Sequence, residues 1–194
     1  MKRNIIGVMG SGVESHEELS APLGQLIAQL GCHLLTGGSS GVMEAVSRAF
    51  CQVEGRQGLC IGIIRSAQLP ELNPQTGRRS YQPGGWNDWV EIPILTHLPL
   101  SGTEGTDYLS RNHINVLTAD AVIALPGGAG TYSEVQLCLQ YGKPLILFLD
   151  GKTIDGKTPQ QIQKELGGSE RIKIADSWED VEKWTERIPF KNKG

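Results

Sequence analysis

The sequence predicts an α/β protein with a three-layer α/β/α, Rossmann-like fold, in which a parallel sheet of about seven strands carries helices on both faces. Three observations predict it. Short runs rich in Val, Ile and Leu alternate with longer segments of helical character along most of the 194 residues. The runs are almost continuously apolar, which is typical of strands covered on both faces. Glycine-rich segments follow several runs, where a strand leads into a helix.

This alternation assigns a residue range to each element. Strands are expected at 5–9, 32–36, 59–64, 90–95, 121–125, 145–149 and 172–175. Helices are expected at 16–30, 41–54, 105–117, 131–142, 158–167 and 177–187. Gly31 stands where a helix C-cap is expected, and Thr158 followed by Pro159 is typical of a helix N-terminus. We therefore expect a single Rossmann-like nucleotide-binding domain over residues 1–194.

A long insertion interrupts the alternation at residues 65–89, which are rich in proline and glycine and contain Trp86 and Trp89. A connection of this length in a compact domain is usually a lid, a binding loop or a segment without fixed structure. Alternatively, the tryptophans only anchor the loop to the core or to a partner subunit. The sequence leaves both interpretations open.

Composition narrows the class of partner. Lys and Arg total 18 against 21 Asp and Glu, so the formal net charge is −3. Because no basic excess is present to neutralise phosphate backbones or anionic lipids, we expect no nucleic-acid partner and no membrane binding. No apolar run approaches the roughly 18 residues of a membrane span, and the first apolar stretch is too short for a secretory signal. We expect a cytoplasmic protein that acts on a small molecule.

The four cysteines, at positions 32, 51, 60 and 138, form no Cys-x-x-Cys pair and have no metal-like spacing with the four histidines. They are interpreted as buried, reduced thiols. Lys143 could suggest the Schiff-base lysine of a pyridoxal enzyme, but a lysine just past a helix C-terminus is explained by the helix dipole. We expect no metal site, no cofactor and no lysine decarboxylase activity.

The segment 126–134, Pro-Gly-Gly-Ala-Gly-Thr-Tyr-Ser-Glu, lies between an apolar run and an expected helix. A loop without side chains that leads into a helix is suited to hold a phosphate, because bare amides and the positive end of the helix dipole converge there. Two more glycine-rich loops follow the expected strands at 5–9 and 32–36. Loops at the carboxyl ends of parallel strands line one crevice, so the sequence predicts a site for a small phosphorylated ligand.

Two common phosphate sites are disfavoured. No Gly-Lys-Ser/Thr tripeptide is present, so a Walker-type ATPase is not expected. The segment 5–12 begins like a dinucleotide fingerprint but lacks the third glycine. Residues 32–36 also lack the acidic residue that would bind a ribose hydroxyl, so NAD is disfavoured.

Three features carry a resemblance to a known family. They are Pro-Gly-Gly-x-Gly-Thr-x-x-Glu at 126–134, Arg111 at 15 positions before Pro126, and Thr-Gly-Gly-x-x-Gly-Val-Met at 36–43. Together they resemble the LOG-like family, long mislabelled as lysine decarboxylases, over most of the chain. Active members are phosphoribohydrolases that cleave nucleoside 5′-monophosphates, including cytokinin nucleotides, into a free base and ribose 5-phosphate. The resemblance implies that Arg111 and Glu134 are the catalytic pair.

The resemblance also implies a set of ligand contacts and an oligomeric state. Gly127, Gly128, Gly130 and Thr131 would hold the phosphate. The other candidate ligand-binding residues lie in the remaining glycine loops, beside Arg111 and at the start of the motif: Gly10, Ser11, Gly12, Gly37, Gly38, Gly41, Met43, Asn112 and Pro126. Members of the family are usually homodimers, so a homodimer or higher homo-oligomer is expected.

The segment 110–115, Ser-Arg-Asn-His-Ile-Asn, departs from the enzymes, which usually carry lysine where this chain has Asn112. It resembles a sister branch that includes the molybdenum cofactor carrier proteins. Gly-Val-Met-Gly at 7–10 and Leu-Leu-Thr-Gly-Gly at 34–38 resemble that branch too. Carriers bind a phosphorylated pterin without hydrolysing a nucleotide, so a carrier or sensor is the alternative function.

Arg111 and Glu134 fit the chemistry of N-glycosidic cleavage. A carboxylate beside the anomeric carbon can stabilise the positive charge of the sugar ring or orient water, and a guanidinium can clamp a phosphate. Both residues also have structural interpretations. Thr131-x-x-Glu134 is a capping box, and Arg111, expected near the middle of helix 105–117, could be an ordinary solvated or ion-paired residue.

Three functions follow. A nucleoside 5′-monophosphate phosphoribohydrolase is favoured, and it predicts base release that depends on Glu134 and Arg111. A carrier or sensor, of molybdenum cofactor or of a nucleotide, predicts stabilisation by ligand without turnover. An interaction protein whose glycine loops are only turns predicts neither effect.

Overall fold

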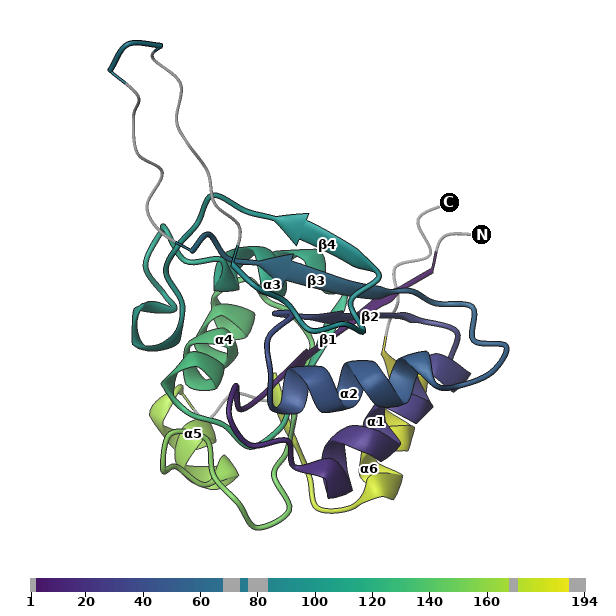
Figure 1. Cartoon of the computed structure of the whole chain (residues 1–194). Helices are drawn as coiled ribbons and strands as arrows, with labels where there is room; N and C mark the ends of the chain where they lie inside the picture. The colour runs from purple at the N-terminus through teal and green to yellow at the C-terminus, as the bar shows by residue number, and fades with distance from the viewer. Residues whose placement is uncertain (1–2, 68–73, 77–83, 168–170, 189–194) are drawn as a thin grey trace.

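The computed structural model describes residues 3–67, 74–76, 84–167 and 171–188, which form a three-layer α/β/α fold (Figure 1). Within these ranges, seven parallel strands pair in the order β4-β3-β2-β1-β5-β6-β7. They are β1 (Ile5–Met9), β2 (His33–Thr36), β3 (Cys60–Ile64), β4 (Ile92–Leu95), β5 (Ala121–Ala124), β6 (Leu145–Phe148) and β7 (Ile172–Ala175). The predicted seven-stranded parallel sheet is confirmed.

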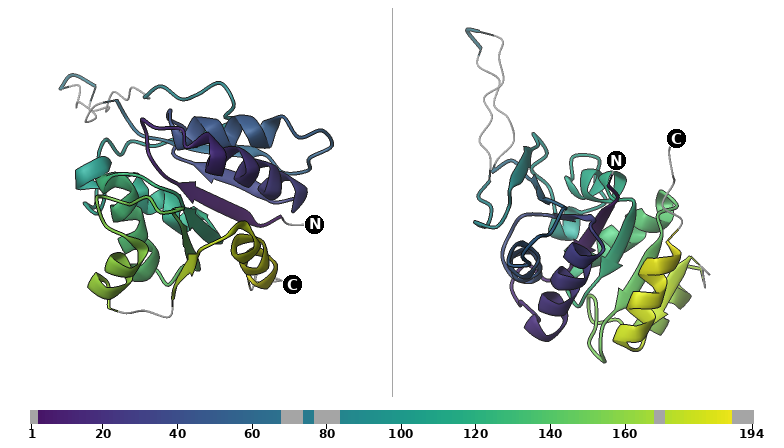
Figure 2. Two further views of the ribbon diagram at one scale, coloured as in Figure 1. Left: turned by 90° about the horizontal axis from the view of Figure 1, so that it is seen from below. Right: turned by 90° about the vertical axis from the view of Figure 1, so that its right-hand side faces the viewer.

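Helices cover both faces of this sheet (Figures 1 and 2). One layer contains α1 (Glu17–Gln29), α2 (Val42–Cys51) and α6 (Trp178–Arg187). The other contains α3 (Asn112–Thr118), α4 (Ala129–Gln140) and α5 (Pro159–Glu165). Each layer packs its own core against the strands, with Phe50 of α2 in one core and Val135 of α4 in the other. Strands between two cores need apolar side chains on both faces, which explains their continuous apolar runs.

Two helix ends follow the local sequence. Gln161 N donates to Thr158 Oγ1 at 3.3 Å, and Thr158 N donates to Gln161 Oε1 at 2.8 Å. These bonds form a capping box, with Pro159 as the first helical residue of α5. Gly31 adopts a φ of 68° just after α1, a conformation that favours glycine. Both predicted helix ends are confirmed.

The order in which the chain adds strands to the sheet reverses at β1, which pairs with β2 on one side and with β5 on the other. At such a point the connections leave toward opposite sides, and a crevice opens outside the carboxyl ends of the strands. The loops after β1, β2, β3 and β5 meet at this edge. The fold therefore brings the three glycine-rich loops together.

The expected helix at 105–117 is wrong in its first half. Helix α3 begins at Asn112, so Arg111 is its N-cap and not a mid-helix residue. The preceding residues form a short 3-10 turn, η1 (Gly102–Glu104), and further turns. A Cβ on Gly105 would clash with Ser133. Tertiary packing, and not local helix propensity, therefore determines the path of this segment.

Parts of the expected insertion, residues 68–73 and 77–83, lie outside the described ranges. The returning end of the insertion is tied to the loop after β2. Asn87 donates to Gly38 O from N at 2.8 Å and from Nδ2 at 3.1 Å. This connection brings Gly84 and Gly85 to the edge of the sheet where the glycine loops meet.

The described ranges contain no helix that is both long enough and apolar enough to span a membrane. All four cysteines are free thiols, and Cys32, Cys60 and Cys138 are buried. This agrees with the expectation of reduced, mostly buried thiols.

Candidate functional site

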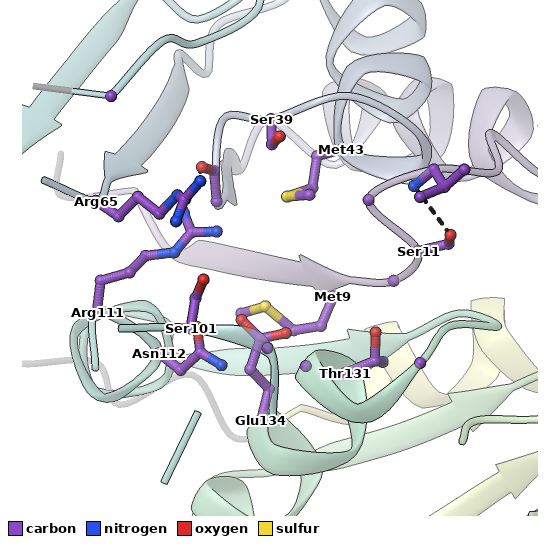
Figure 3. Close-up of a pocket in the computed structure, with 18 of the residues that line it drawn as sticks. Met9, Ser11, Ser39, Met43, Arg65, Ser101, Arg111, Asn112, Thr131 and Glu134 are labelled. Carbon is purple, nitrogen blue, oxygen red and sulfur yellow. Dashed lines mark hydrogen bonds between the residues drawn. The ribbon is translucent and has the colours of Figure 1, made fainter. Parts of the chain in front are cut away.

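A cavity of about 630 Å³ lies at the carboxyl ends of the central strands, and we call it the crevice (Figure 3). Its walls come from the loops after β1, β2 and β3 and from the first turns of α3 and α4. Most of the sequence-predicted site residues line it: Gly10, Ser11, Gly12, Gly37, Met43, Arg111, Asn112, Gly128, Gly130, Thr131 and Glu134. The fold thus gathers residues from four separate segments around one cavity.

The remaining four predicted residues do not line the crevice. Pro126 and Gly127 line an adjoining cavity of about 420 Å³ instead. Gly127 has no room for a side chain, because a Cβ would clash with Thr131 and lie 2.9 Å from Ser11 N. Gly38 and Gly41 have φ angles of 73° and 67°, which only glycine adopts readily. These glycines shape the loops around the crevice.

The start of α4 presents backbone amides to the crevice. Gly128 is the N-cap and has an extended backbone, with no side-chain cap. Within the described part of the chain, the amides of residues 128–131 have no hydrogen-bond partner, and the first to have one is Tyr132 N, which donates to Gly128 O at 3.1 Å. Free amides at the positive end of a helix dipole favour an anion.

Glu134 lies one turn further along α4, and its carboxyl group faces the crevice (Figure 3). The residue is only 7% exposed. Asn115 Nδ2 of α3 donates to Glu134 Oε1 at 2.7 Å. Burial raises the pKa of Glu134 to about 7, although Arg111 and the Asn115 bond act in the opposite direction. A carboxyl group with this pKa can accept or donate a proton near neutral pH.

The capping-box interpretation of Glu134 is wrong. Helix α4 begins at Ala129, so Thr131 lies inside the helix and does not cap it. The described contact of Glu134 goes to α3 and not back to a cap amide. Glycine at the cap position lets the helix begin two residues earlier than the threonine suggested.

Arg111 extends from the start of α3 across the ends of β2 and β3. Its Nη1 donates to the carbonyl oxygens of Gly37 and Ile63. The residue is 7% exposed, and its Nε is buried without a hydrogen-bond partner. Burial lowers the pKa of Arg111, Glu134 opposes this shift, and Arg65 adds to it. Part of the guanidinium therefore serves to hold the two loops, and it is not the surface ion-pair residue that the sequence also allowed.

Asn112 joins the same wall to α4. Its Nδ2 donates to Ser133 Oγ at 2.9 Å, and Ser133 Oγ donates to Gly130 O at 2.7 Å. A lysine at position 112, as in the enzymes that the motif resembles, would not reproduce this pair of neutral bonds. Asn112 here stabilises the loop that starts α4.

Sequence reasoning missed several residues that line the crevice, among them Arg65, Ser39 and Ser101. Arg65 directly follows β3, so its position at a strand end was a usable signal, although its segment was assigned to the insertion. Ser39 lies inside a glycine loop that was recognised. Ser101 carries no local signal, because long-range folding alone brings it to the crevice.

His113 and Lys143 lie outside the crevice. His113 Nδ1 is 2.7 Å from the Tyr141 hydroxyl, so this imidazole has a packing and hydrogen-bonding role. Lys143 Nζ donates to the carbonyls of Leu117 and Ala119 at the end of α3, at 2.9 and 2.5 Å. Among the described residues, no group of three or more His, Cys, Asp or Glu side chains could hold a metal ion.

Comparison with known proteins gives a consistent result. The sequence model of the SLOG cluster4 family matches residues 3–181. A protein of Archaeoglobus fulgidus is 31% identical over 169 residues, which cover 83% of this chain and 93% of that protein.

Two solved structures extend the comparison. The molybdenum cofactor binding protein of the phototrophic bacterium Rippkaea orientalis is 35% identical with a TM-score of 0.69, over 97% of this chain and 98% of that one. The molybdenum cofactor carrier protein of Chlamydomonas reinhardtii is 26% identical with a TM-score of 0.65, over 96% and 98%. The expected resemblance to a LOG-like branch with molybdenum cofactor carriers is confirmed.

Proposed function

The chain belongs to the SLOG cluster4 family, and from this premise and the geometry of the crevice we propose that it binds and carries a phosphorylated small molecule. Molybdenum cofactor, a phosphorylated pterin, is the candidate ligand. The observation that carries this proposal is the row of free amides at residues 128–131, which start α4 at the wall of the crevice.

The charge of the crevice supports an anionic ligand. Among the described residues that line it, the charged side chains are Arg65, Arg111 and Glu134. Two cations against one carboxyl group leave an excess of positive charge, and this excess grows when Glu134 is protonated. A phosphate monoester, which carries close to two negative charges at neutral pH, complements that excess.

The carrier function is favoured over hydrolysis by the state of Arg111 and by the comparisons. Nη1 of Arg111 already donates to the carbonyls of Gly37 and Ile63. The guanidinium therefore cannot present its full bidentate face to a phosphate. The similar protein from Rippkaea orientalis is described as binding molybdenum cofactor.

The experiment is direct binding. The purified protein is mixed with molybdenum cofactor released from a molybdoenzyme under anaerobic conditions and is then separated by gel filtration. We expect bound pterin to elute with the protein. Gly128→Val adds a side chain beside the free amides, in space where a Cβ meets no protein atom within 4 Å, and should abolish this co-elution. The exposed α6 change Glu186→Gln should not. Absence of bound pterin with folded wild-type protein would contradict the proposal.

A second candidate function, phosphoribohydrolase, is favoured by Glu134 alone. Its carboxyl group lines the crevice and has a pKa raised by burial to about 7. An ionised Glu134 could stabilise the positive charge that develops on a ribose ring during N-glycosidic cleavage. Incubation with AMP, GMP, CMP, UMP and a cytokinin monophosphate, followed by chromatography, tests it. Base release that Glu134→Gln abolishes and Glu186→Gln leaves intact would establish hydrolysis.

The assembly that we propose is a homodimer. The register pairs Ile61 with Ile92 and Ile63 with Ile94, so the four isoleucines share one face of β3 and β4. Ile92 and Ile94 remain 40% and 39% exposed. An exposed apolar face on an edge strand is unfavourable unless it is covered, and a second copy of the chain would cover it.

A further inference from the structure

Two clusters of anion-binding groups lie at opposite ends of the crevice. Figure 3 places Arg65 and Arg111 at one end and Ser11 and Thr131 at the other, with Met9 and Met43 between them. The Thr131 end carries the free amides of α4. The Arg65 end holds both cations among the described lining residues, but no particular group of the ligand has yet been assigned to it.

Arg65 and Arg111 differ in what they can offer a ligand. Arg111 is buried, and its Nη1 donates hydrogen bonds to two backbone carbonyls. The Arg65 side chain is exposed at the rim and, within the described residues, has no hydrogen-bond or ion-pair partner. No described residue uses its five N–H donors, which form a planar fork that matches a carboxylate or phosphate.

The backbone of Arg65 is held in place, although no described residue binds its side chain. Gly84 N donates to Arg65 O at 2.9 Å, and the neighbouring Ser66 N donates to Leu98 O at 3.0 Å. Thr96 N donates to Ile64 O at 2.9 Å on the other side. The backbone that carries the guanidinium is thus fixed at the end of β3. Less entropy is therefore lost when the side chain orders around a ligand.

A second observation concerns hydrogen bonding at this end, where a buried donor of Arg111 has no partner among the described residues. Arg111 Nε is buried without a partner, and Arg65 is a like charge beside it. Buried guanidinium groups are normally paired, because an unpaired donor in the interior is costly. The carboxyl group among the described lining residues is that of Glu134, and its Oε1 already accepts a bond from Asn115.

We infer that Arg65 is a specificity-determining residue that binds a second anionic group of the ligand, opposite its phosphate. The inference rests on the proposed function, in which the phosphate occupies the start of α4. It narrows the ligand class to a phosphate monoester that carries a further anionic group at the end distant from the phosphate. A simple nucleoside monophosphate lacks that substituent and leaves Arg65 unused.

The test uses three matched probes: uridine 5′-monophosphate and its 5-carboxy and 6-carboxy derivatives. The two derivatives add one carboxylate at different edges of the base. Affinities are measured by calorimetry at one salt concentration. We expect the wild type to bind at least one derivative about tenfold more tightly than the parent, which is the effect of one charge-assisted hydrogen-bonded contact.

Three variants separate the two ends of the crevice. Arg65→Gln should remove the tenfold advantage and leave the affinity for the parent unchanged, and Arg65→Lys should keep part of it. Thr131→Val should weaken all three probes alike. Arg187→Gln, on the exposed surface of α6, removes the same charge elsewhere and should change nothing.

The outcomes distinguish a failure of the role of Arg65 from a failure of the phosphate site at α4. If the parent binds but neither derivative binds more tightly, or if the advantage survives in Arg65→Gln, the inference about Arg65 is overturned while the phosphate site stands. If the wild type binds none of the three probes, the phosphate site at α4 is itself contradicted, and the inference is lost with it.

Discussion

Asn115 donates a hydrogen bond from Nδ2 to Oε1 of Glu134 at 2.7 Å, and this bond ties α3 to α4 beside the crevice. The two residues are 19 positions apart in the sequence. Both side chains are buried, so the bond forms out of contact with bulk water. It holds the carboxyl group of Glu134 in one orientation toward the crevice, and it stabilises the ionised form of that group.

Glu134 should make the protein less stable as the pH rises. Its pKa is about 7 in the folded protein and 4.5 in the unfolded chain, so between these pH values the folded protein binds more protons than the unfolded chain does. Stability that is present below pH 4.5 is therefore lost up to about pH 7. Glu134→Gln removes this loss and should gain up to about 3 kcal/mol over the wild type at pH 8. Urea unfolding at pH 4.5 and pH 8 measures the difference, and an equal effect at both would contradict it.

Asn115 should lower the pH at which Glu134 titrates. Asn115→Leu removes the donor and keeps a side chain of similar size, so the ionised carboxylate loses a stabilising bond and its pKa should rise above the wild-type value. Carbon-13 NMR of the glutamate carboxyl groups follows the titration directly. Asn112→Leu serves as the control, because Asn112 bonds Ser133 and not Glu134. An unchanged titration midpoint in Asn115→Leu would refute this role.

Gly24 should be needed for the packing of α1 on α2. Alanine has the better helix propensity by about 1 kcal/mol, which alone would stabilise α1. A Cβ at this position would clash with Val46 O and lie 2.8 Å from Phe50 N, and backbone atoms cannot move aside cheaply. The overpacking cost of about 1–3 kcal/mol should exceed the gain in helix propensity, so Gly24→Ala should lower the free energy of unfolding. Gly85→Ala, which meets nothing within 4 Å, is the control, and a stabilised Gly24→Ala would count against the packing argument.

The exposed isoleucines of β4 should hold the proposed dimer together. Ile94→Lys places a charge in that apolar face and should convert the dimer to a monomer that keeps its fold. Leu30→Lys is a matched control, because Leu30 is also 39% exposed but lies at the end of α1. Light scattering coupled to gel filtration measures the mass. A monomeric wild type, or a dimer that survives Ile94→Lys, would refute the proposed interface.

The strands and most helices could be predicted because their signals are local. A strand covered on both faces is apolar throughout, as at Ala121–Ala124, and no distant residue is needed to recognise it. Glycine loops after strands carry their own signal in the same way. The first half of the expected helix 105–117 failed because Gly105 packs against Ser133 of α4, a contact that no window of neighbouring residues contains.

The amino-acid sequence by itself determined the α/β class, the number of strands and the glycine loops, and it singled out Arg111 and Glu134. Only the tertiary structure decided what these two side chains contact: Arg111 spans to Gly37 and Ile63, and Glu134 meets Asn115. It alone also brought Arg65 to the crevice. The physical reason is range. Periodicity and turn chemistry act between neighbours in the chain, whereas charge, burial and hydrogen bonding at the crevice depend on residues that meet only after the sheet has formed.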